Sequence, residues 1–71
     1  MPLIHVMNAS ASDRDRKREL IARLTETYAD VMQMRPDTIR VVIDEHSRDS
    51  WGVGGLTLED SGQDESVSPR G

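Results

Sequence analysis

The 71-residue sequence predicts an α/β (α+β) fold, in which a β-α-β unit is followed by a short C-terminal hairpin. Three patterns lead to this prediction. Two short stretches are apolar with alternating faces, a longer segment between them has helical periodicity, and a glycine-rich segment follows. Two strands joined by a helix of this length form a crossover unit, so the two main strands are expected to be parallel.

The first strand is expected over residues 3–7, directly after Met1 and Pro2. Ile4 and Val6 point to one face of it, and the odd-numbered residues point to the other. A strand that begins this early holds the chain terminus in the fold, whereas most termini fray.

A helix is expected from about Asp13 to Gln33. Apolar residues recur there at spacings of one, three and four and form a stripe along one face: Leu20, Ile21, Leu24, Tyr28, Val31 and Met32. Asp13 or Ser12 can cap its N-terminus. The step from Arg35 to Pro36 is expected to end the helix, because a residue that precedes proline disfavours the helical conformation.

The second strand is expected over residues 38–45, TIRVVIDE. The segment WGVGG, residues 51–55, then places three glycines within four positions, which suits a tight turn or a small hairpin. Leu56 and Leu58 are expected to complete a short strand.

Composition limits the class of protein. Residues 2–58 are expected to form one small domain, and residues 59–71 an acidic tail that remains disordered because it has little to bury. The net charge is −4, of which the tail carries −3 from four acids and one base. This charge argues against nucleic-acid binding, and no apolar run approaches the roughly 18 residues of a membrane span. With no signal peptide at its start, the chain is expected to be cytoplasmic.

The expected core is too small for one chain to be stable alone. There is no cysteine for a disulfide, and His5 and His46 lack the neighbours of a structural zinc site, so no metal is expected. The sheet face opposite the helix would carry Leu3, Met7 and Val42 and would be left in water. The sheet is therefore expected to be completed by oligomerisation, most simply with further copies of this chain.

Pro2 is the candidate catalytic residue of the sequence. If Met1 is removed, the nitrogen of Pro2 becomes a secondary amine at the start of a strand. Apolar surroundings and nearby cations lower the pKa of such an amine, because both disfavour its charged form. A base brought near the working pH suits proton transfer on a carbon acid. The alternative is that Met-Pro is an ordinary start without chemical meaning.

Four motifs, PLIHV, SDRDRKRELI, TIRVVIDE and WGVGG, together resemble the 4-oxalocrotonate tautomerase family in order and spacing over about residues 2–58. The resemblance implies a hexamer built from dimers. It also implies cofactor-free keto–enol tautomerisation of enol or dienol acids such as 2-hydroxymuconate. By position, Pro2 matches the catalytic acid/base, Arg40 the arginine that a neighbouring subunit supplies to the substrate, and Trp51 the aromatic wall of the pocket.

One position departs from the family pattern. The family carries an arginine in the loop before the helix, where it binds the far carboxylate of a diacid, and this sequence has Ala11, Ser12 and Asp13 there. Ser12 offers a hydroxyl to the substrate in place of the guanidinium. Losing one charge-assisted contact costs about 1.5–3 kcal/mol, so a diacid is expected to bind poorly unless another subunit supplies the cation. The sequence then predicts a monoacid or a bulkier, less charged substrate, or a slow enzyme of broad specificity.

Two alternatives remain open at this point. The chain could be a non-catalytic or partner-dependent subunit of a hetero-oligomer whose other chain brings the missing arginine. It could also be a relative that hydrates or dehalogenates 3-haloacrylates, with Asp44 or Glu45 activating water. His5 is interpreted as an interface histidine and His46 as a loop residue.

Overall fold

The computed structural model describes residues 1–62 of the chain. They form two compact units. Residues 1–6 and 12–44 make up the first unit, and residues 7–11 and 45–62 belong to the second. The acidic tail expected over 59–71 lies, from residue 63 on, outside the described residues.

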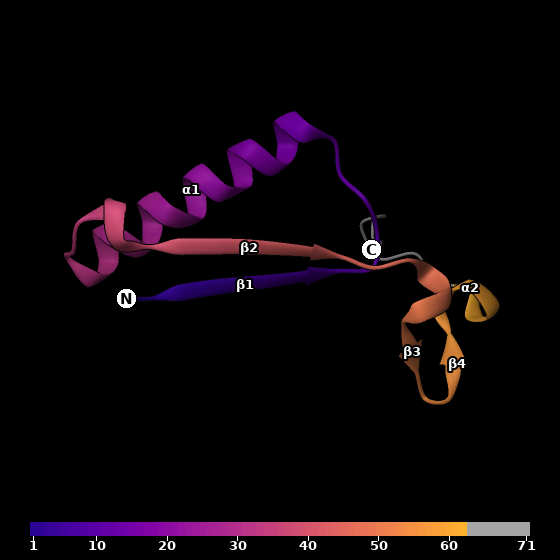
Figure 1. Cartoon of the computed structure of the whole chain (residues 1–71). Coiled ribbons are helices and arrows are strands. Elements are labelled where there is room, and N and C mark those ends of the chain that lie inside the picture. The colour runs from indigo at the N-terminus through magenta and orange to yellow at the C-terminus, as the bar shows by residue number, and fades with distance from the viewer. Residues whose placement is uncertain (63–71) are drawn as a thin grey trace. The chain divides into compact units, whose positions relative to one another are not determined.

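The order of elements confirms the β-α-β prediction (Figure 1). Strand β1 (Leu3–Asn8) is followed by helix α1 (Arg14–Met32), the short 3₁₀ helix η1 (Pro36–Thr38) and strand β2 (Arg40–Glu45). β1 and β2 are hydrogen-bonded neighbours and run in the same direction. Both strands pass from the first unit into the second.

Helix α1 begins where the sequence places it. Asp13 is the N-cap, and its carboxylate accepts a hydrogen bond from the backbone N–H of Arg16 at 2.7 Å. This bond satisfies one of the N–H groups that the first helical turn leaves without a partner. Asp15 adds a negative charge at the positive end of the helix dipole.

Helix α1 ends within one residue of the expected position, but the proline is not what ends it. The helix stops at Met32, because Gln33 adopts the left-handed conformation with φ 55° and ψ 54°. The N–H groups of Gln33 and Met34 both donate to the carbonyl of Ala29, the latter at 3.0 Å. Pro36 does not terminate α1 but opens η1 three residues later, where its fixed φ suits a first helical position.

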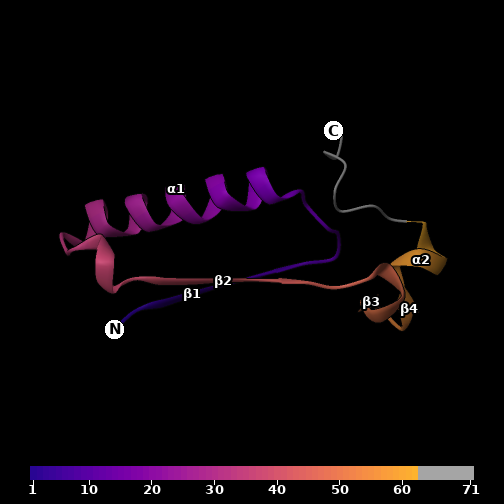
Figure 2. The same ribbon diagram turned by 45° about the horizontal axis from the view of Figure 1, so that its top comes forward.

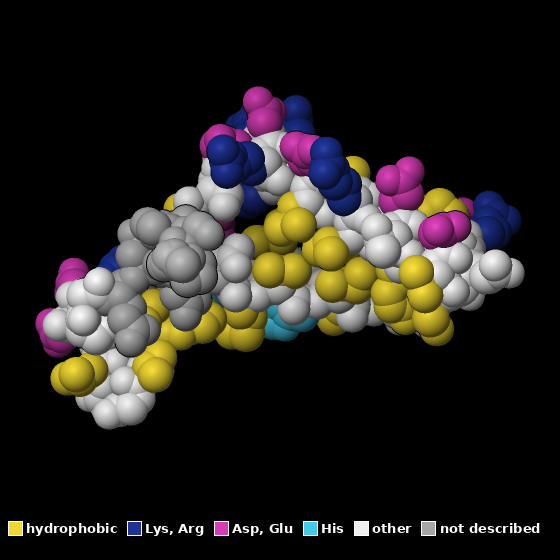
Figure 3. All heavy atoms as spheres, turned by 180° about the vertical axis from the view of Figure 1, so that it is seen from behind, with side chains coloured by type: hydrophobic (Ala, Val, Ile, Leu, Met, Phe, Trp, Pro, Cys, Tyr) yellow, Lys and Arg dark blue, Asp and Glu magenta, His cyan; other side chains and the backbone are white. Residues whose placement is uncertain are grey.

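In the first unit, α1 lies along one face of the strands (Figure 2). Apolar side chains of α1 meet β1 there and line a hollow of about 340 Å³: Ile4, Leu24, Thr27, Tyr28, Val31 and Met32. On the space-filling surface, apolar side chains of this unit gather in one area and charged side chains lie along its outer edge (Figure 3). The amphipathic pattern of the helix is therefore realised in the fold.

The second unit contains a 3₁₀ helix η2 (Arg48–Ser50), strands β3 (Gly52–Val53) and β4 (Leu56–Thr57), and the short helix α2 (Leu58–Ser61). β3 and β4 form the predicted hairpin as an antiparallel pair. Gly54 and Gly55 make its turn with φ values of 64° and 92°. A two-residue hairpin loop with both residues at positive φ favours glycine at both positions, which explains the repeated glycines.

The prediction that Leu58 completes the last strand is wrong. Leu58 is the first residue of α2, and its side chain is fully buried. The Thr57 hydroxyl caps this helix by accepting a hydrogen bond from the N–H of Asp60 at 3.0 Å. A threonine followed by acidic residues is a helix start, and this signal outweighs the apolar alternation of Leu56 and Leu58.

Little apolar surface is removed from water within residues 1–62. Only Ala9, Ala29 and Leu58 are buried apolar residues there. On the strands, Leu3 is 60% exposed, Met7 52% and Val42 44%, as the sequence predicted for the side without a helix. None of the helices in this part of the chain combines the length and the apolar character that crossing a bilayer requires.

Candidate active site

Pro2 and Arg40 are joined by a backbone hydrogen bond. The carbonyl oxygen of Pro2 accepts from the N–H of Arg40 at 3.0 Å, just where β1 and β2 begin side by side. Pro2 is half-buried, whereas the preceding Met1 is 83% exposed. The structure therefore brings these two predicted site residues together and holds the proline at a fixed place.

The side chain of Arg40 is exposed. By the alternation along β2, it shares a face with Val42 and Asp44, and Asp44 in turn is hydrogen-bonded to His5 of β1. Within residues 1–62, the guanidinium of Arg40 makes no ion pair or hydrogen bond. It is thus presented outward from the chain that carries it.

Ser12 lies elsewhere in the first unit. It is half-buried and directly precedes Asp13, the N-cap of α1. Figure 1 shows that α1 begins at the end of this unit that is remote from the N-terminus. One chain by itself therefore does not bring Ser12 next to Pro2 and Arg40.

Trp51 belongs to the second unit, between η2 and β3. It is half-buried, and its carbonyl oxygen accepts a hydrogen bond from the N–H of Leu58 at 2.8 Å. Its ring meets that of His46 edge to face, with centroids 6.1 Å apart and planes inclined at 63°. The tryptophan is fixed both by its backbone and by its ring.

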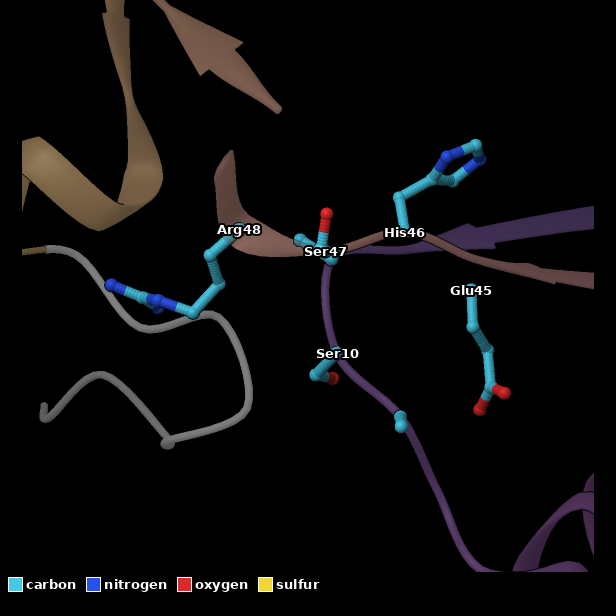
Figure 4. Close-up of a pocket in the computed structure, with 7 residues that line it drawn as sticks. Ser10, Glu45, His46, Ser47 and Arg48 are labelled. Atoms are coloured by element: carbon cyan, nitrogen blue, oxygen red, sulfur yellow. The ribbon is translucent and has the colours of Figure 1, made fainter. Parts of the chain in front are cut away.

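A polar hollow of about 500 Å³ lies in the second unit (Figure 4). It is lined by two short segments: Ala9, Ser10, Ala11, Glu45, His46, Ser47 and Arg48. The guanidinium of Arg48 donates through Nη2 to the carbonyl oxygen of Leu58 at 2.8 Å. Sequence reasoning treated residues 46–50 as a polar loop and missed this hollow.

His46 is more than a loop residue. Its N–H donates to the carbonyl of Asn8 at 2.8 Å, which extends the pairing of the two strands by one bond. Its Nε2 is buried and has no hydrogen-bond partner among residues 1–62. Figure 4 shows its ring on the opposite side of the backbone from the side chain of Glu45. The ring of His46 therefore packs against Trp51 and does not lie beside the side chain of Glu45.

The residues so placed offer distinct chemical groups. The nitrogen of Pro2 becomes an amine base if Met1 is removed, and Arg40 is a permanent cation that suits carboxylates and developing negative charge on oxygen. Trp51 is a rigid apolar surface. Together these groups suit proton transfer on an organic acid.

Comparison with known proteins identifies the family of the chain. The profile of the family described as tautomerase enzyme matches residues 2–61. A probable tautomerase of Halalkalibacterium halodurans is 35% identical over 60 residues, covering 84% of this chain and 98% of its own. The solved structure of a 4-oxalocrotonate tautomerase homologue is 32% identical with a TM-score of 0.76, covering 84% of this chain and 95% of its own.

A heterohexamer 4-oxalocrotonate tautomerase from Chloroflexus aurantiacus shares the fold. Its TM-score is 0.77 at 23% identity, with 84% of this chain and 97% of its own covered. Structural neighbours therefore include oligomeric assemblies. The match of the family profile to most of the chain, together with the relative from Halalkalibacterium and the shared fold, shows that this chain belongs to the tautomerase family.

Proposed function

We propose that this chain is a cofactor-free isomerase, a keto–enol tautomerase of an enol or dienol carboxylic acid. The amine of Pro2 acts as general acid and base after Met1 is removed. The observation that supports this most directly is the hydrogen bond between Pro2 and Arg40, because it holds the proline at a defined place instead of in a fraying terminus.

In the proposed reaction, the amine of Pro2 takes the proton from the enol hydroxyl. The O–H electron pair forms the carbonyl, and the displaced C=C pair takes the proton back from Pro2 at carbon, so atoms and charge balance. Arg40 of a neighbouring copy binds the substrate carboxylate and stabilises the negative charge that develops on oxygen. Trp51 keeps water away from the amine.

Removal of Met1 is a condition of this mechanism. A retained methionine ties the nitrogen of Pro2 into a peptide bond, where it is not basic. The side chain of Met1 is 83% exposed, so it is accessible to an aminopeptidase. Intact-mass spectrometry of the purified protein is expected to show the mass of the chain without this residue.

The proposal includes assembly into a homohexamer, a trimer of dimers. The exposed Leu3, Met7 and Val42 need cover, and Arg40 carries its cation outward. A second candidate is a hetero-oligomer, which the absence of an arginine at Ala11 and Ser12 favours. A chain that, purified alone, is hexameric and turns substrate over would exclude the second candidate.

The test is a spectrophotometric tautomerase assay on 2-hydroxymuconate and on phenylenolpyruvate. Pro2→Ala is expected to lower kcat/KM by about a hundredfold or more on any substrate that is turned over, since a positioned general base contributes roughly 10²–10⁴ in rate. The matched control is Pro36→Ala, which changes an exposed proline at the start of η1. Equal rates for Pro2→Ala and the unaltered protein would refute the proline mechanism.

A further inference from the structure

The contact between the rings of His46 and Trp51 carries an inference about how the proposed pocket wall is held. The two rings meet edge to face, with centroids 6.1 Å apart and planes inclined at 63°. Aromatic pairs favour this geometry because the positive edge of one ring meets the negative face of the other. Such a contact is directional, so it fixes the tilt of the indole as well as its position.

Both ends of this contact have an anchored backbone. The N–H of His46 donates to the carbonyl oxygen of Asn8 at 2.8 Å, and the N–H of Leu58 donates to the carbonyl oxygen of Trp51, also at 2.8 Å. Leu58 in turn is fully buried. The freedom that remains to Trp51 is therefore the rotation of its side chain, and the ring of His46 restricts this rotation.

The turn between the two residues is closed by its own hydrogen bonds. The N–H of Ser50 donates to the carbonyl oxygen of Ser47 at 3.0 Å, across η2. The hydroxyl of Ser47 donates to the carboxylate of Asp49 and lies 3.1 Å from the hydroxyl of Ser50. Because these bonds fix the spacing between residues 46 and 51, the approach of the two rings is built into the turn.

The buried nitrogen of His46 indicates that the ring is used for packing. Nε2 is buried and has no hydrogen-bond partner among residues 1–62. A buried polar atom without a partner destabilises the fold, and an added proton at this atom would find no acceptor there. Nε2 is thus not placed to pass on a proton, and what His46 offers to Trp51 is a flat ring of fixed orientation.

We propose that His46 is a positioning residue of the reaction, whose ring holds the indole of Trp51 at the angle at which it forms the pocket wall. The inference rests on the proposed function, since it takes Trp51 to keep water away from the amine of Pro2. His46 affects turnover through Trp51 and not by contact with the substrate. An apolar side chain at residue 46 removes the buried nitrogen, but only a flat ring reproduces the edge-to-face contact.

Two substitutions separate the ring from the nitrogen. His46→Phe keeps a flat ring, whereas His46→Leu keeps an apolar side chain of similar size without a ring. Both remove the unpartnered nitrogen, so both are expected to raise the midpoint of thermal unfolding measured by circular dichroism. A lower rate in either variant then cannot be attributed to a less stable fold.

The decisive measurement is the fluorescence anisotropy decay of Trp51. The sequence contains a single tryptophan, so the signal reports the motion of this indole alone. His46→Leu is expected to speed up the decay and to lower kcat/KM in the tautomerase assay by about two- to tenfold, the range covered by the directional part of one aromatic contact. His46→Phe is expected to retain both values of the unaltered protein.

Thr57→Ala is the matched control, because it removes the hydroxyl that caps α2 in the same unit. It is expected to lower the midpoint of unfolding and to leave the anisotropy decay and kcat/KM unchanged. A stability effect is thereby distinguished from the release of the indole.

Three outcomes would overturn the proposal. One is an unchanged anisotropy decay in His46→Leu, and another is a faster decay in this variant without a loss of kcat/KM. The third is an equal loss of kcat/KM in His46→Phe and His46→Leu, since the nitrogen would then act itself. If Pro2→Ala leaves the turnover rates unchanged, the proposed function fails, while the anisotropy decay still decides whether His46 holds Trp51.

Discussion

The imidazole Nε2 of His5 and the carboxylate of Asp44 are hydrogen-bonded across β1 and β2, on the sheet face that no helix covers. Both side chains are 46% exposed in the single chain. A pair so exposed contributes about 0–1 kcal/mol. If a second copy covers this face, the pair is shielded from water. Removing one partner of such a buried pair strongly destabilises the protein, because the other charge is left buried without compensation.

The first prediction concerns this pair. Asp44→Asn is expected to lower the free energy of unfolding of an isolated chain by less than about 1 kcal/mol but to weaken the assembly by several times as much. Sedimentation analysis measures the assembly. The control is Asp37→Asn, which breaks the more exposed pair between Arg35 and Asp37. Similar effects of both substitutions would show that this face is not an interface.

The second prediction tests whether Arg40 acts on a neighbouring copy. When each variant is assembled alone, Pro2→Ala is expected to lower kcat/KM by about a hundredfold or more. Arg40→Ala is expected to lower it by about tenfold or more. When the two variants are refolded together, about a quarter of the sites combine an intact Pro2 with an intact Arg40 from another copy. Activity in the mixture that stays at the level of the separate variants would place both residues of each site in one chain.

The third prediction compares two leucines of the hairpin segment. Leu58→Ala is expected to cost about 2–5 kcal/mol, because the side chain is fully buried and its removal leaves a cavity. Leu56→Ala is expected to cost much less, because Leu56 is 56% exposed. Thermal unfolding by circular dichroism measures both. Equal losses would mean that Leu56 becomes buried in the assembly, which the same measurement at the dissociated state would reveal.

The fourth prediction concerns the hairpin turn. Gly54→Asn is expected to be nearly neutral, because asparagine tolerates the left-handed conformation at φ 64°. Gly54→Val is expected to cost about 1–2 kcal/mol. A Cβ at this position meets no atom within 4 Å, so the difference reports backbone strain and not a clash. The midpoints of thermal unfolding are expected to rank in this order.

Most of the fold could be predicted from the sequence. The strands around residues 3–7 and 38–45, the helix between them and the WGVGG hairpin follow from periodicity and from turn chemistry. Two details were wrong. Helix α1 ends because Gln33 adopts the left-handed conformation, which its residue type does not predict, and not because of Pro36. Leu58 begins α2, because the threonine cap before it outweighs the apolar alternation.

The candidate site was less accessible to sequence reasoning. Pro2 and Arg40 carry a motif, and the structure places them side by side. Arg48 and His46 belong to no sequence motif. Their positions in the hollow depend on how residues 45–48 meet residues 9–11 in space. Such a contact between distant segments leaves no periodic trace in the chain.

The small number of buried apolar side chains within residues 1–62, namely Ala9, Ala29 and Leu58, has a thermodynamic consequence. If association supplies most of the apolar burial, the melting temperature of the chain depends on the protein concentration. Each dilution step then lowers the midpoint of thermal denaturation, and the specific activity falls with it. Assays at nanomolar and at micromolar enzyme concentration are therefore expected to give different specific activities.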